Sequence, residues 1–456
     1  MEITEPQIKR GLTPHQVLIL SFLLLISLGT FLLALPISTN GPSLSFVDAL
    51  FTSTSASCVT GLIVVDTGSR FSTLGRWIIL LLIQLGGLGI MTYSTFFILF
   101  FTKKLSFRGR EIIQQTLSSI PYSDIGSLLR SILIFTFSIE ALGALMLTFR
   151  WWLQYPLKKS IYLGIFHSIS AFCNAGFSPF SGSLVNYRSD LVINLVMISL
   201  IILGGLGFMA LLDIKRFLLW KEKEKKRRLT LHTKIVLVST AILIGGGTIL
   251  FLLLESGQIL RGFPLQVKLL SSFFQTVTPR TAGFNTIDIG SLANPTLLFL
   301  IVLMFIGASP GSCGGGIKTS TFSVLIALFS ARLRGRERVH LFGRRLPQEA
   351  TARSISILVS SVLVIFLFAL ALMVVTKGIS GEERGLVPKV LFEVTSAFGT
   401  VGLSMGLTPH LSVLGKILII MVVFIGRVGP LTVAMAVGES KEGVRYKYPE
   451  ENVMVG

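Results

Sequence analysis

The 456-residue chain has few of the residues from which catalytic, metal-binding and disulfide-stabilised sites are built. Its three cysteines, Cys58, Cys173 and Cys313, have the spacing of neither a disulfide framework nor a zinc motif. Its five histidines are scattered, and no HExxH motif and no Ser/His or Asp/Asp arrangement falls within an apolar segment. We therefore expect a protein that is not an enzyme and that needs no chemical cofactor.

Charged residues are scarce as well. They make up 14% of the chain against 51% hydrophobic residues, and the mean hydropathy is +0.77, which excludes an ordinary soluble domain. A stretch of about 20 apolar residues crosses the roughly 30 Å hydrocarbon core of a bilayer as a helix. We expect an all-α integral membrane protein with eight such crossings, near residues 15–36, 76–101, 129–153, 190–214, 233–254, 294–329, 354–376 and 414–437.

The first apolar stretch follows Lys9 and Arg10, which is also the pattern of a secretory signal peptide. Its apolar run is longer than the roughly 7–15 residues usual in such a peptide. We interpret it as the first crossing.

Acidic residues are few relative to basic ones, 22 Asp and Glu against 41 Lys and Arg. The basic excess lies between the apolar stretches, at 103–110, 215–234 and 332–353, which argues against nucleic-acid binding. Because basic loops stay in the cytoplasm, we expect these loops and both termini on the inner side of a bacterial plasma membrane. Such loops also suit anionic lipid head groups or an acidic partner protein.

One short motif occurs four times, each copy lying between two apolar stretches. The copies read FTSTSASCVTGL from Phe51, FHSISAFCNAGF from Phe166, FFQTVTPRTAGF from Phe273 and FEVTSAFGTVGL from Phe392. Each is too short to span a membrane and too apolar for a free loop, so we expect a half-helix and a turn that enter the membrane and return. Four copies indicate a pseudo-fourfold assembly around a common axis. The predicted units are residues 1–110, 111–228, 229–350 and 351–438, followed by a polar cytoplasmic tail, 439–456.

Each of the four turns ends in glycine, which lets backbone carbonyls approach an axis closely. Carbonyl rings can replace the hydration shell of a monovalent cation, and the C-terminal ends of the half-helices also favour cations. The flanking side chains are neutral, whereas a divalent-ion filter more often carries carboxylates. The alternative is that these glycines serve close helix packing. The predicted filter residues are Val59, Thr60, Gly61, Asn174, Ala175, Gly176, Thr281, Ala282, Gly283, Thr400, Val401 and Gly402.

A glycine-rich segment in the third unit, IGASPGSCGGGIKTS from Ile306, cannot form an uninterrupted helix. We expect it to break into a loop that protrudes into the path below the turns. It is not a phosphate-binding loop, because Ile317 stands where glycine must precede the lysine. Arg427, at the matching place in the fourth unit, is expected to hydrogen-bond this loop rather than to form a packing ion pair. The predicted gate residues are Gly307, Gly311, Gly314, Gly315, Gly316, Lys318 and Arg427.

Other polar residues lie beside the half-helices. We expect Arg280 and Glu393 to pair behind the filter, because an unpaired charge there would be costly. His167 matches Glu393 in the second unit, where we favour a structural hydrogen bond over proton coupling. Asp66 and Asp288 lie just outside the turns, where they either concentrate cations or serve as ordinary solvated loop carboxylates. Lys318 either stabilises the lower end of the broken helix or extends to the cytoplasm.

These motifs, together with QLGGLGIM from Gln84, ILGGLGFM from Ile202 and IGRVGPLTVAM from Ile425, resemble the Trk/Ktr/HKT superfamily of potassium transporters over almost the whole chain. The resemblance implies four membrane helix, pore loop, membrane helix units, each built like a potassium-channel subunit. It also implies that the four glycines form a K⁺ filter and that the glycine-rich loop is a gate. Gly61 stands where relatives that admit Na⁺ often carry serine, which favours K⁺.

The chain begins directly with the first unit and so resembles the Ktr-type membrane subunit more than the longer Trk-type members. This resemblance implies a homodimer on a cytosolic ring of nucleotide-binding regulatory subunits of the RCK/KTN type. The predicted function is K⁺ uptake, with Na⁺ as a candidate activator. The alternative is a symporter that couples K⁺ to Na⁺ or H⁺.

Overall fold

The computed structural model describes residues 14–89, 125–218, 228–376 and 385–437. The predicted tail 439–456, the basic loop 103–110 and the end of the second apolar stretch lie outside the described residues. The regular structure of the described part is helical except for one hairpin, formed by β1 (His340–Leu341) and β2 (Arg344–Arg345), and two isolated bridges. The helical class predicted from the sequence is confirmed.

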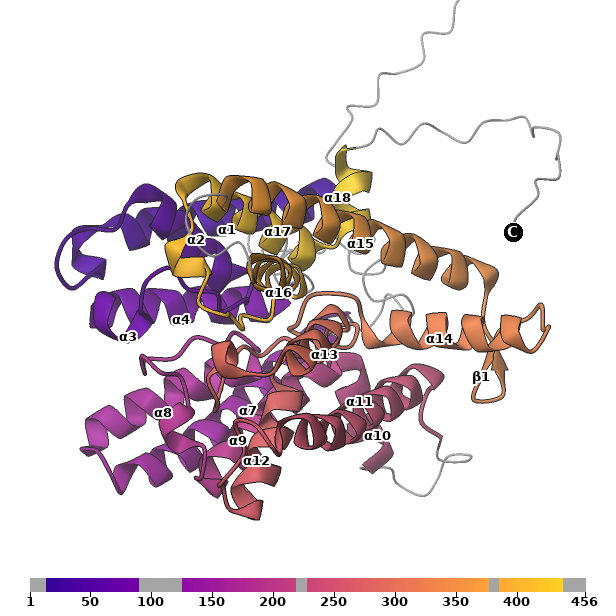
Figure 1. Cartoon of the computed structure of the whole chain (residues 1–456), viewed down its shortest axis with the longest axis horizontal. Coiled ribbons are helices and arrows are strands. Elements are labelled where there is room, and N and C mark those ends of the chain that lie inside the picture. The colour runs from indigo at the N-terminus through magenta and orange to yellow at the C-terminus, as the bar shows by residue number, and fades with distance from the viewer. Residues whose placement is uncertain (1–13, 90–124, 219–227, 377–384, 438–456) are drawn as a thin grey trace, which may run out of the picture.

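A long apolar helix, a short helix and a second apolar segment follow one another four times along the chain (Figure 1). The long helices are α1 (Pro14–Ala34), α7 (Ile125–Trp152), α11 (Leu231–Glu255) and α15 (Gln348–Thr376). The short helices are α2 (Phe46–Ser57), α8 (Leu157–Phe172), α12 (Leu265–Val277) and α16 (Leu386–Gly399). The second segments are α4 (Thr73–Gly87), α9 (Leu191–Leu206) with α10 (Phe208–Leu218), α13 (Asn294–Phe305) with α14 (Thr319–Leu333), and α17 (Val413–Val428) with α18 (Pro430–Val437).

Three of the four second segments begin where a polar side chain caps the helix, whereas α13 begins with a proline in its first turn and has no such cap. Ser72 accepts a hydrogen bond from the Gly75 amide, Asp190 from the Ile193 amide, and Ser412 from the Gly415 amide. Such a cap satisfies an amide that has no partner within the helix. The connections before these helices hold the short elements α3 (Thr67–Arg70), η3 (Val185–Tyr187), η4 (Ile289–Ser291) and η5 (Thr408–His410), and η1 (Pro36–Ser38) lies between α1 and α2.

By length and composition, the four long helices can each cross a membrane. Two bent pairs can each form one further span: α9 and α10 meet at 101°, and α17 and α18 at 93°. α4, α13 and α14 are shorter apolar helices. The eight predicted crossings therefore stay a prediction.

Two of the predicted stretches, 190–214 and 414–437, are bent and not straight. Each bends at a glycine with positive φ, Gly207 (87°) and Gly429 (95°). Gly89 stands at the matching place of the first unit and also has a positive φ of 76°. In both bent segments the glycine takes a conformation that is disfavoured for other residues, whereas α13 ends at Phe305 and the third segment is interrupted over residues 306–318.

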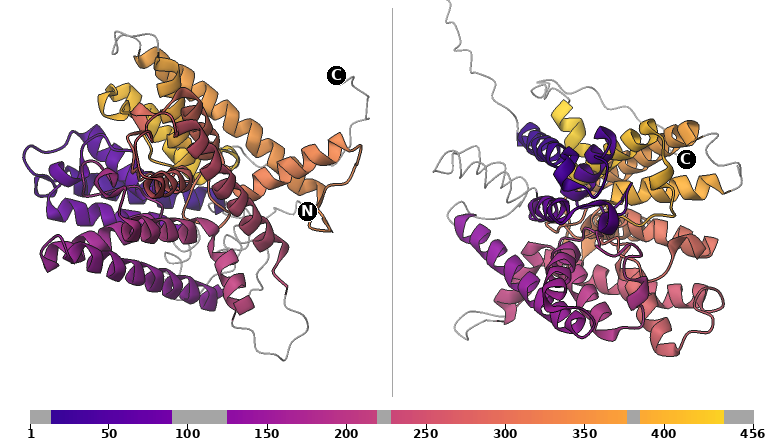
Figure 2. Two further views of the ribbon diagram at one scale, coloured as in Figure 1. Left: turned by 60° about the horizontal axis from the view of Figure 1, so that its bottom comes forward. Right: turned by 90° about the vertical axis from the view of Figure 1, so that its left-hand side faces the viewer.

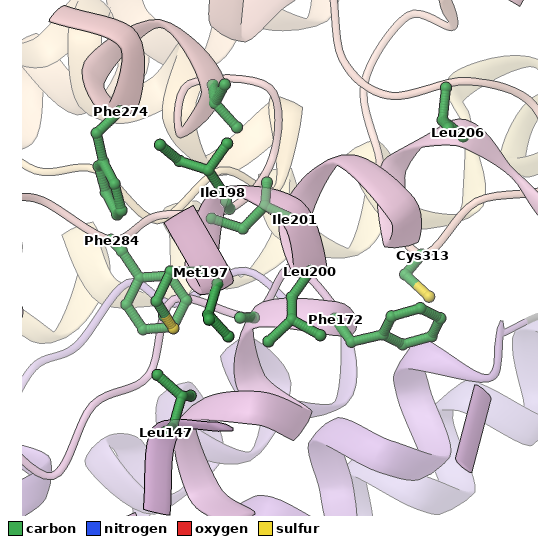
Figure 3. Packing of buried hydrophobic residues seen from close by; sticks show 14 of the residues in the cluster. Leu147, Phe172, Met197, Ile198, Leu200, Ile201, Leu206, Phe274, Phe284 and Cys313 are labelled. Atoms are coloured by element: carbon green, nitrogen blue, oxygen red, sulfur yellow. The ribbon is translucent and has the colours of Figure 1, made fainter. Parts of the chain in front are cut away.

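The first and last units of the chain lie side by side, with α2 against α17 and α1 against α18 (Figure 2). The bulky residue after each turn glycine links neighbouring units. Leu62 packs with α15, α16 and α17, Phe177 with the first unit, Phe284 with the second, and Leu403 with the third. Figure 3 shows Phe284 within the cluster of the second unit. The four units therefore follow one another in a closed cycle.

Large apolar side chains cover the outside of the long helices. Phe31, Phe149, Leu253 and Phe366 are each more than 60% exposed. Apolar surface on this scale is covered by lipid or by another protein, which fits helices of membrane-spanning length.

Candidate functional site

The four turns that follow the short helices share one backbone conformation. Gly61, Gly176, Gly283 and Gly402 have φ values of 90°, 71°, 77° and 91°. Two positions earlier, a non-glycine residue is also left-handed in every copy, with φ between 48° and 80°: Val59, Asn174, Thr281 and Thr400. Such strained residues persist only where the surroundings hold them, and they cluster at functional sites.

These glycines meet one another in chain order. A Cβ added to Gly61 would lie 2.5 Å from the Ala175 carbonyl oxygen, and one added to Gly176 would lie 2.9 Å from that of Ala282. At Gly283 it would collide with the Val401 oxygen, and at Gly402 with the Thr60 oxygen, which closes the ring. The twelve predicted filter residues are therefore brought together, and four carbonyl oxygens lie beside the glycines of the adjacent turns.

The short helices end where these turns begin. Cys58 and Cys173, the residues that follow α2 and α8, still donate backbone hydrogen bonds into the last helical turn. The partly negative C-terminal ends of the helices therefore lie next to the turn carbonyls. Both groups favour a cation over an anion.

Hydroxyl groups from the short helices hold each turn, and the sequence analysis missed them. Ser55 donates to the Leu62 carbonyl (2.7 Å) and accepts from the Gly61 amide (3.1 Å). Ser170 donates to the Phe177 carbonyl, and Ser396 accepts from the Gly402 amide. In the third copy Val277 replaces this serine, and Thr278 donates to the Phe284 carbonyl instead. The sequence did carry a signal for this role, because serine occupies the same motif position in three of the four copies.

The predicted ion pair between Arg280 and Glu393 does not form. Arg280 donates to Thr240 Oγ1 (3.3 Å), and Glu393 accepts hydrogen bonds from the Ser404 hydroxyl, the Leu407 amide and the Thr408 hydroxyl. The side chains of one unit satisfy the buried carboxyl group, so it needs no partner from another unit. It ties the half-helix α16 to the segment outside its turn.

His167 occupies the same place in the second unit and makes an equivalent contact. Its Nδ1 donates to the Leu163 carbonyl (2.9 Å), so its Nε2 accepts from the Ser178 hydroxyl (3.0 Å). Ser178 lies eleven residues after His167, and Ser404 lies eleven residues after Glu393. Both side chains thus brace a half-helix against the segment that leaves its turn, which agrees with the structural role favoured for His167.

A cavity of about 330 Å³ opens on one side of the ring. All four turn glycines line it, together with Asp66 and Asp288. Asp66 also caps α3 and accepts from the Ser181 hydroxyl (3.1 Å), and Asp288 accepts from the Gly290 amide (3.3 Å). Both carboxylates therefore have structural partners and still face the space before the ring.

On the other side of the ring, residues 306–318 form the predicted non-helical loop between α13 and α14. Its Gly315 amide donates to Thr400 Oγ1 (3.0 Å), and a Cβ on Gly314 would collide with Thr281 Oγ1. Thr281 Oγ1 in turn lies 3.2 Å from the Asn174 side-chain amide. The loop is therefore in contact with the turn residues themselves.

The loop is also attached to the bend of the second unit. Ser309 and Cys313 donate backbone hydrogen bonds to the Gly205 and Gly204 carbonyls, and Phe208 donates to the Gly311 carbonyl (3.0 Å). Lys318 Nζ donates back to the Gly314 carbonyl (2.6 Å). This contact lies within the loop and agrees with the stabilising one of the two roles considered for Lys318, which stays a prediction.

Arg427 is buried and joins three units. Its guanidinium donates one hydrogen bond to the Cys313 carbonyl in the loop and another to the Gly86 carbonyl at the end of α4. Among the described residues it has no carboxylate partner within ion-pair distance, so the packing ion pair is not formed. The expected contact with the loop is present.

A family model described as cation transport protein, TrkH, matches residues 4–444. The chain belongs to this family. Together with the apolar helices, this membership makes it an integral membrane protein.

Relatives of this TrkH-family chain cover its full length. The chain is 40% identical to the Ktr system potassium uptake protein B of Bacillus subtilis (strain 168), over 97% of each chain. It is 38% identical to the potassium/sodium uptake protein NtpJ of Enterococcus hirae, over 100% of each, and 39% identical to the Ktr system potassium uptake protein B of Vibrio alginolyticus, over 97% of this chain and 94% of that one. These relatives are named as transporters and not as enzymes.

A solved structure shares the fold. The crystal structure of the potassium transporter TrkH from Vibrio parahaemolyticus matches with a TM-score of 0.76 and 18% sequence identity, over 96% of this chain and 87% of the other. At this identity the likeness concerns the fold alone.

We expect Glu393→Gln to destabilise this TrkH-family chain by about 1–3 kcal/mol, since an amide nitrogen placed toward the Thr408 hydroxyl or the Leu407 amide cannot accept their hydrogen bonds. Thermal unfolding in detergent measures the effect. Glu349→Gln, at the first turn of α15 and exposed, is the matched control and should leave the midpoint unchanged. An equal midpoint for both variants would show that Glu393 does not brace α16.

Proposed function

We propose that this chain takes up K⁺ across a bacterial plasma membrane through the ring of four glycine turns. The observation that carries the proposal is the closure of that ring, in which each glycine approaches the carbonyl oxygen of the next turn. Carbonyl oxygens arranged in this way replace the water around a dehydrated monovalent cation. The names of the relatives, potassium uptake proteins at about 40% identity, support K⁺ as that cation.

In this proposal the twelve turn residues are the selectivity filter, and the ion enters from the cavity lined by Asp66 and Asp288. The loop 306–318 is the gate, since it contacts Thr281 and Thr400 directly below the ring. Arg427 and Lys318 hold the gate closed through their hydrogen bonds to its carbonyls. Serine and threonine hydroxyls, with His167 and Glu393, keep the filter rigid.

We assign eight crossings to the four units. Both termini are placed inside because the basic loops between the crossings belong on the inner side. A homodimer on a cytosolic nucleotide-binding ring is proposed from the Ktr-type resemblance and from the relatives named as parts of a Ktr system. The second candidate function is a K⁺ symporter coupled to Na⁺ or H⁺. A relative named as a potassium/sodium uptake protein favours this second candidate, and its similarity covers the full length of both chains.

The deciding experiment is cation flux in liposomes that hold the purified protein. We expect K⁺ to enter at least about tenfold faster than Na⁺, equal to about 1.4 kcal/mol of selectivity. K⁺ flux that persists when Na⁺ is removed from both sides and at constant pH supports uptake without coupling. Flux that stops without Na⁺ supports the symporter, and equal entry of K⁺ and Na⁺ would contradict the K⁺ filter.

A further inference from the structure

A groove separate from the ion path runs along the outside of the third unit, between α11 and α14. Its volume is about 350 Å³. The walls are apolar: Val238 and Ile242 come from α11 and Ile326 from α14, and these three side chains are 42%, 66% and 53% exposed. Apolar walls open to the outside of a membrane helix are a contact for hydrocarbon.

The lower end of the groove is basic, in contrast to its apolar walls. Arg334, Arg336 and Arg338 line it, together with β1 and Phe342 from the hairpin that follows α14 (Figure 1). Between residues 332 and 345 the chain carries six arginines and a single acidic residue, Glu337. Within the described residues the ion pairs are Arg150 with Asp190 and Lys416 with Asp48, so these arginines have no described carboxylate partner.

The two ends of the groove lie at different depths in the bilayer. Ile326 precedes Arg334 by eight residues, which is about 12 Å along a helix at 1.5 Å per residue. The basic loop between residues 332 and 353 belongs to the inner surface by its charge. The groove therefore runs from the head-group level about 12 Å into the hydrocarbon.

We propose that this groove binds one anionic phospholipid, with its phosphate head group on Arg334, Arg336 and Arg338 and an acyl chain between α11 and α14. Charge complementarity selects the head group, because basic clusters at the inner surface attract anionic lipids and arginine binds phosphate in a bidentate manner. The apolar walls select a lipid over a water-soluble phosphate or an acidic peptide. α14 begins directly after the gate loop, so the lipid sits against the helix that follows the gate.

The test compares the lipids that remain bound to the purified full-length protein, measured by native mass spectrometry after exchange into micelles with equal phosphatidylglycerol and phosphatidylcholine. We expect the unmodified protein to retain phosphatidylglycerol preferentially. The triple variant Arg334→Gln, Arg336→Gln, Arg338→Gln should lose at least about tenfold of that retention. The matched control Arg332→Gln, Arg344→Gln, Arg345→Gln removes the same charge from residues that do not line the groove, and should change it less than twofold.

A second pair of variants tests the acyl chain without changing charge. Ala327→Trp fills the groove and should reduce retention of phosphatidylglycerol to the level of the first triple variant, whereas Phe329→Trp, on the same helix but outside the groove, should not. Equal losses in both triple variants would show diffuse attraction only and overturn the proposal. The proposal would also be overturned if Ala327→Trp left the retention of phosphatidylglycerol unchanged. Cross-linking that found a second copy of the chain or an acidic protein in the groove, in place of lipid, would overturn it as well.

Discussion

Gly402→Ser should reduce the ratio of K⁺ to Na⁺ flux by at least about tenfold, or about 1.4 kcal/mol. Gly402 has φ of 91°, and a Cβ there would collide with the Thr60 carbonyl oxygen. That oxygen must move, so the carbonyl ring that replaces the hydration shell loses its shape. The measurement is tracer flux in liposomes with K⁺ and Na⁺ in parallel.

Gly406→Ser is the matched control for this prediction. Gly406 lies four residues away, has φ of 84°, and has nothing within 4 Å of an added Cβ. Serine there meets the same kind of backbone strain, of order 1–3 kcal/mol, without touching the ring. We expect a lower unfolding midpoint but unchanged selectivity. A Gly402→Ser protein that still conducts with the original K⁺ to Na⁺ ratio would refute the filter.

The ring also predicts an order among its glycines. A Cβ on Gly176 would lie 2.9 Å from its nearest oxygen, which is less crowded than at Gly402. A neighbour can yield a few tenths of an ångström more easily than it can vacate its position. The same measurement on Gly176→Ser should therefore give the smaller loss of selectivity.

The four turns were predictable because close approach and positive φ both exclude side chains at the same position. Either requirement selects glycine, and together they leave it in every copy, at Gly61, Gly176, Gly283 and Gly402. The non-helical conformation of the loop 306–318 was predictable for a related reason. Five glycines and a proline between 307 and 316 leave too little helix propensity for any other outcome.

The bends at Gly207 and Gly429 were not predictable in the same way. Each is a glycine near the end of a long apolar run, and in membranes such a glycine often serves helix packing. Gly204 and Gly426, three residues earlier, do so, since a Cβ on either would collide with the carbonyl of Phe172 or Phe398. Sequence alone does not separate the packing glycine from the bending one.

The Arg280 and Glu393 prediction failed because alignment of the repeats fixes the place of a residue along a half-helix but not what lies beside it. Ser404 and Thr408, from the same unit as Glu393, reach its carboxyl group first. A carboxyl group already satisfied by local donors gains little from a distant cation whose desolvation is costly. The hydrogen bonds from the hydroxyls of Ser55, Ser170 and Ser396 to the turn backbone were not predicted. Serine is common in such sequences, and these hydrogen bonds can be recognised only once the conformation of the turn is known.

Arg427→Gln should raise K⁺ flux in the absence of any cytosolic partner by about 10- to 100-fold. The guanidinium holds the loop by a charge-assisted hydrogen bond to the Cys313 carbonyl and ties it to α4 through the Gly86 carbonyl. Hydrogen bonds to charged groups contribute about 1.5–3 kcal/mol each, and every 1.4 kcal/mol shifts a closed-to-open equilibrium tenfold. Lys416→Gln removes a charge from the same helix α17, where Lys416 pairs with Asp48, and should leave basal flux unchanged.

Labelling of Cys313 separates gate opening from general loss of structure. In a background with Cys58→Ala and Cys173→Ala, Cys313 is the one thiol left in the chain, and it is buried in the closed loop. If Arg427 holds the gate, Arg427→Gln should speed the reaction of Cys313 with a water-soluble thiol reagent while the unfolding midpoint stays within a few degrees of the parent. Unchanged flux with unchanged labelling would show that Arg427 only packs three units together. A large fall in the midpoint with no gain in flux would show the same, because a gate held by Arg427 should open the path and expose Cys313 once the guanidinium is removed.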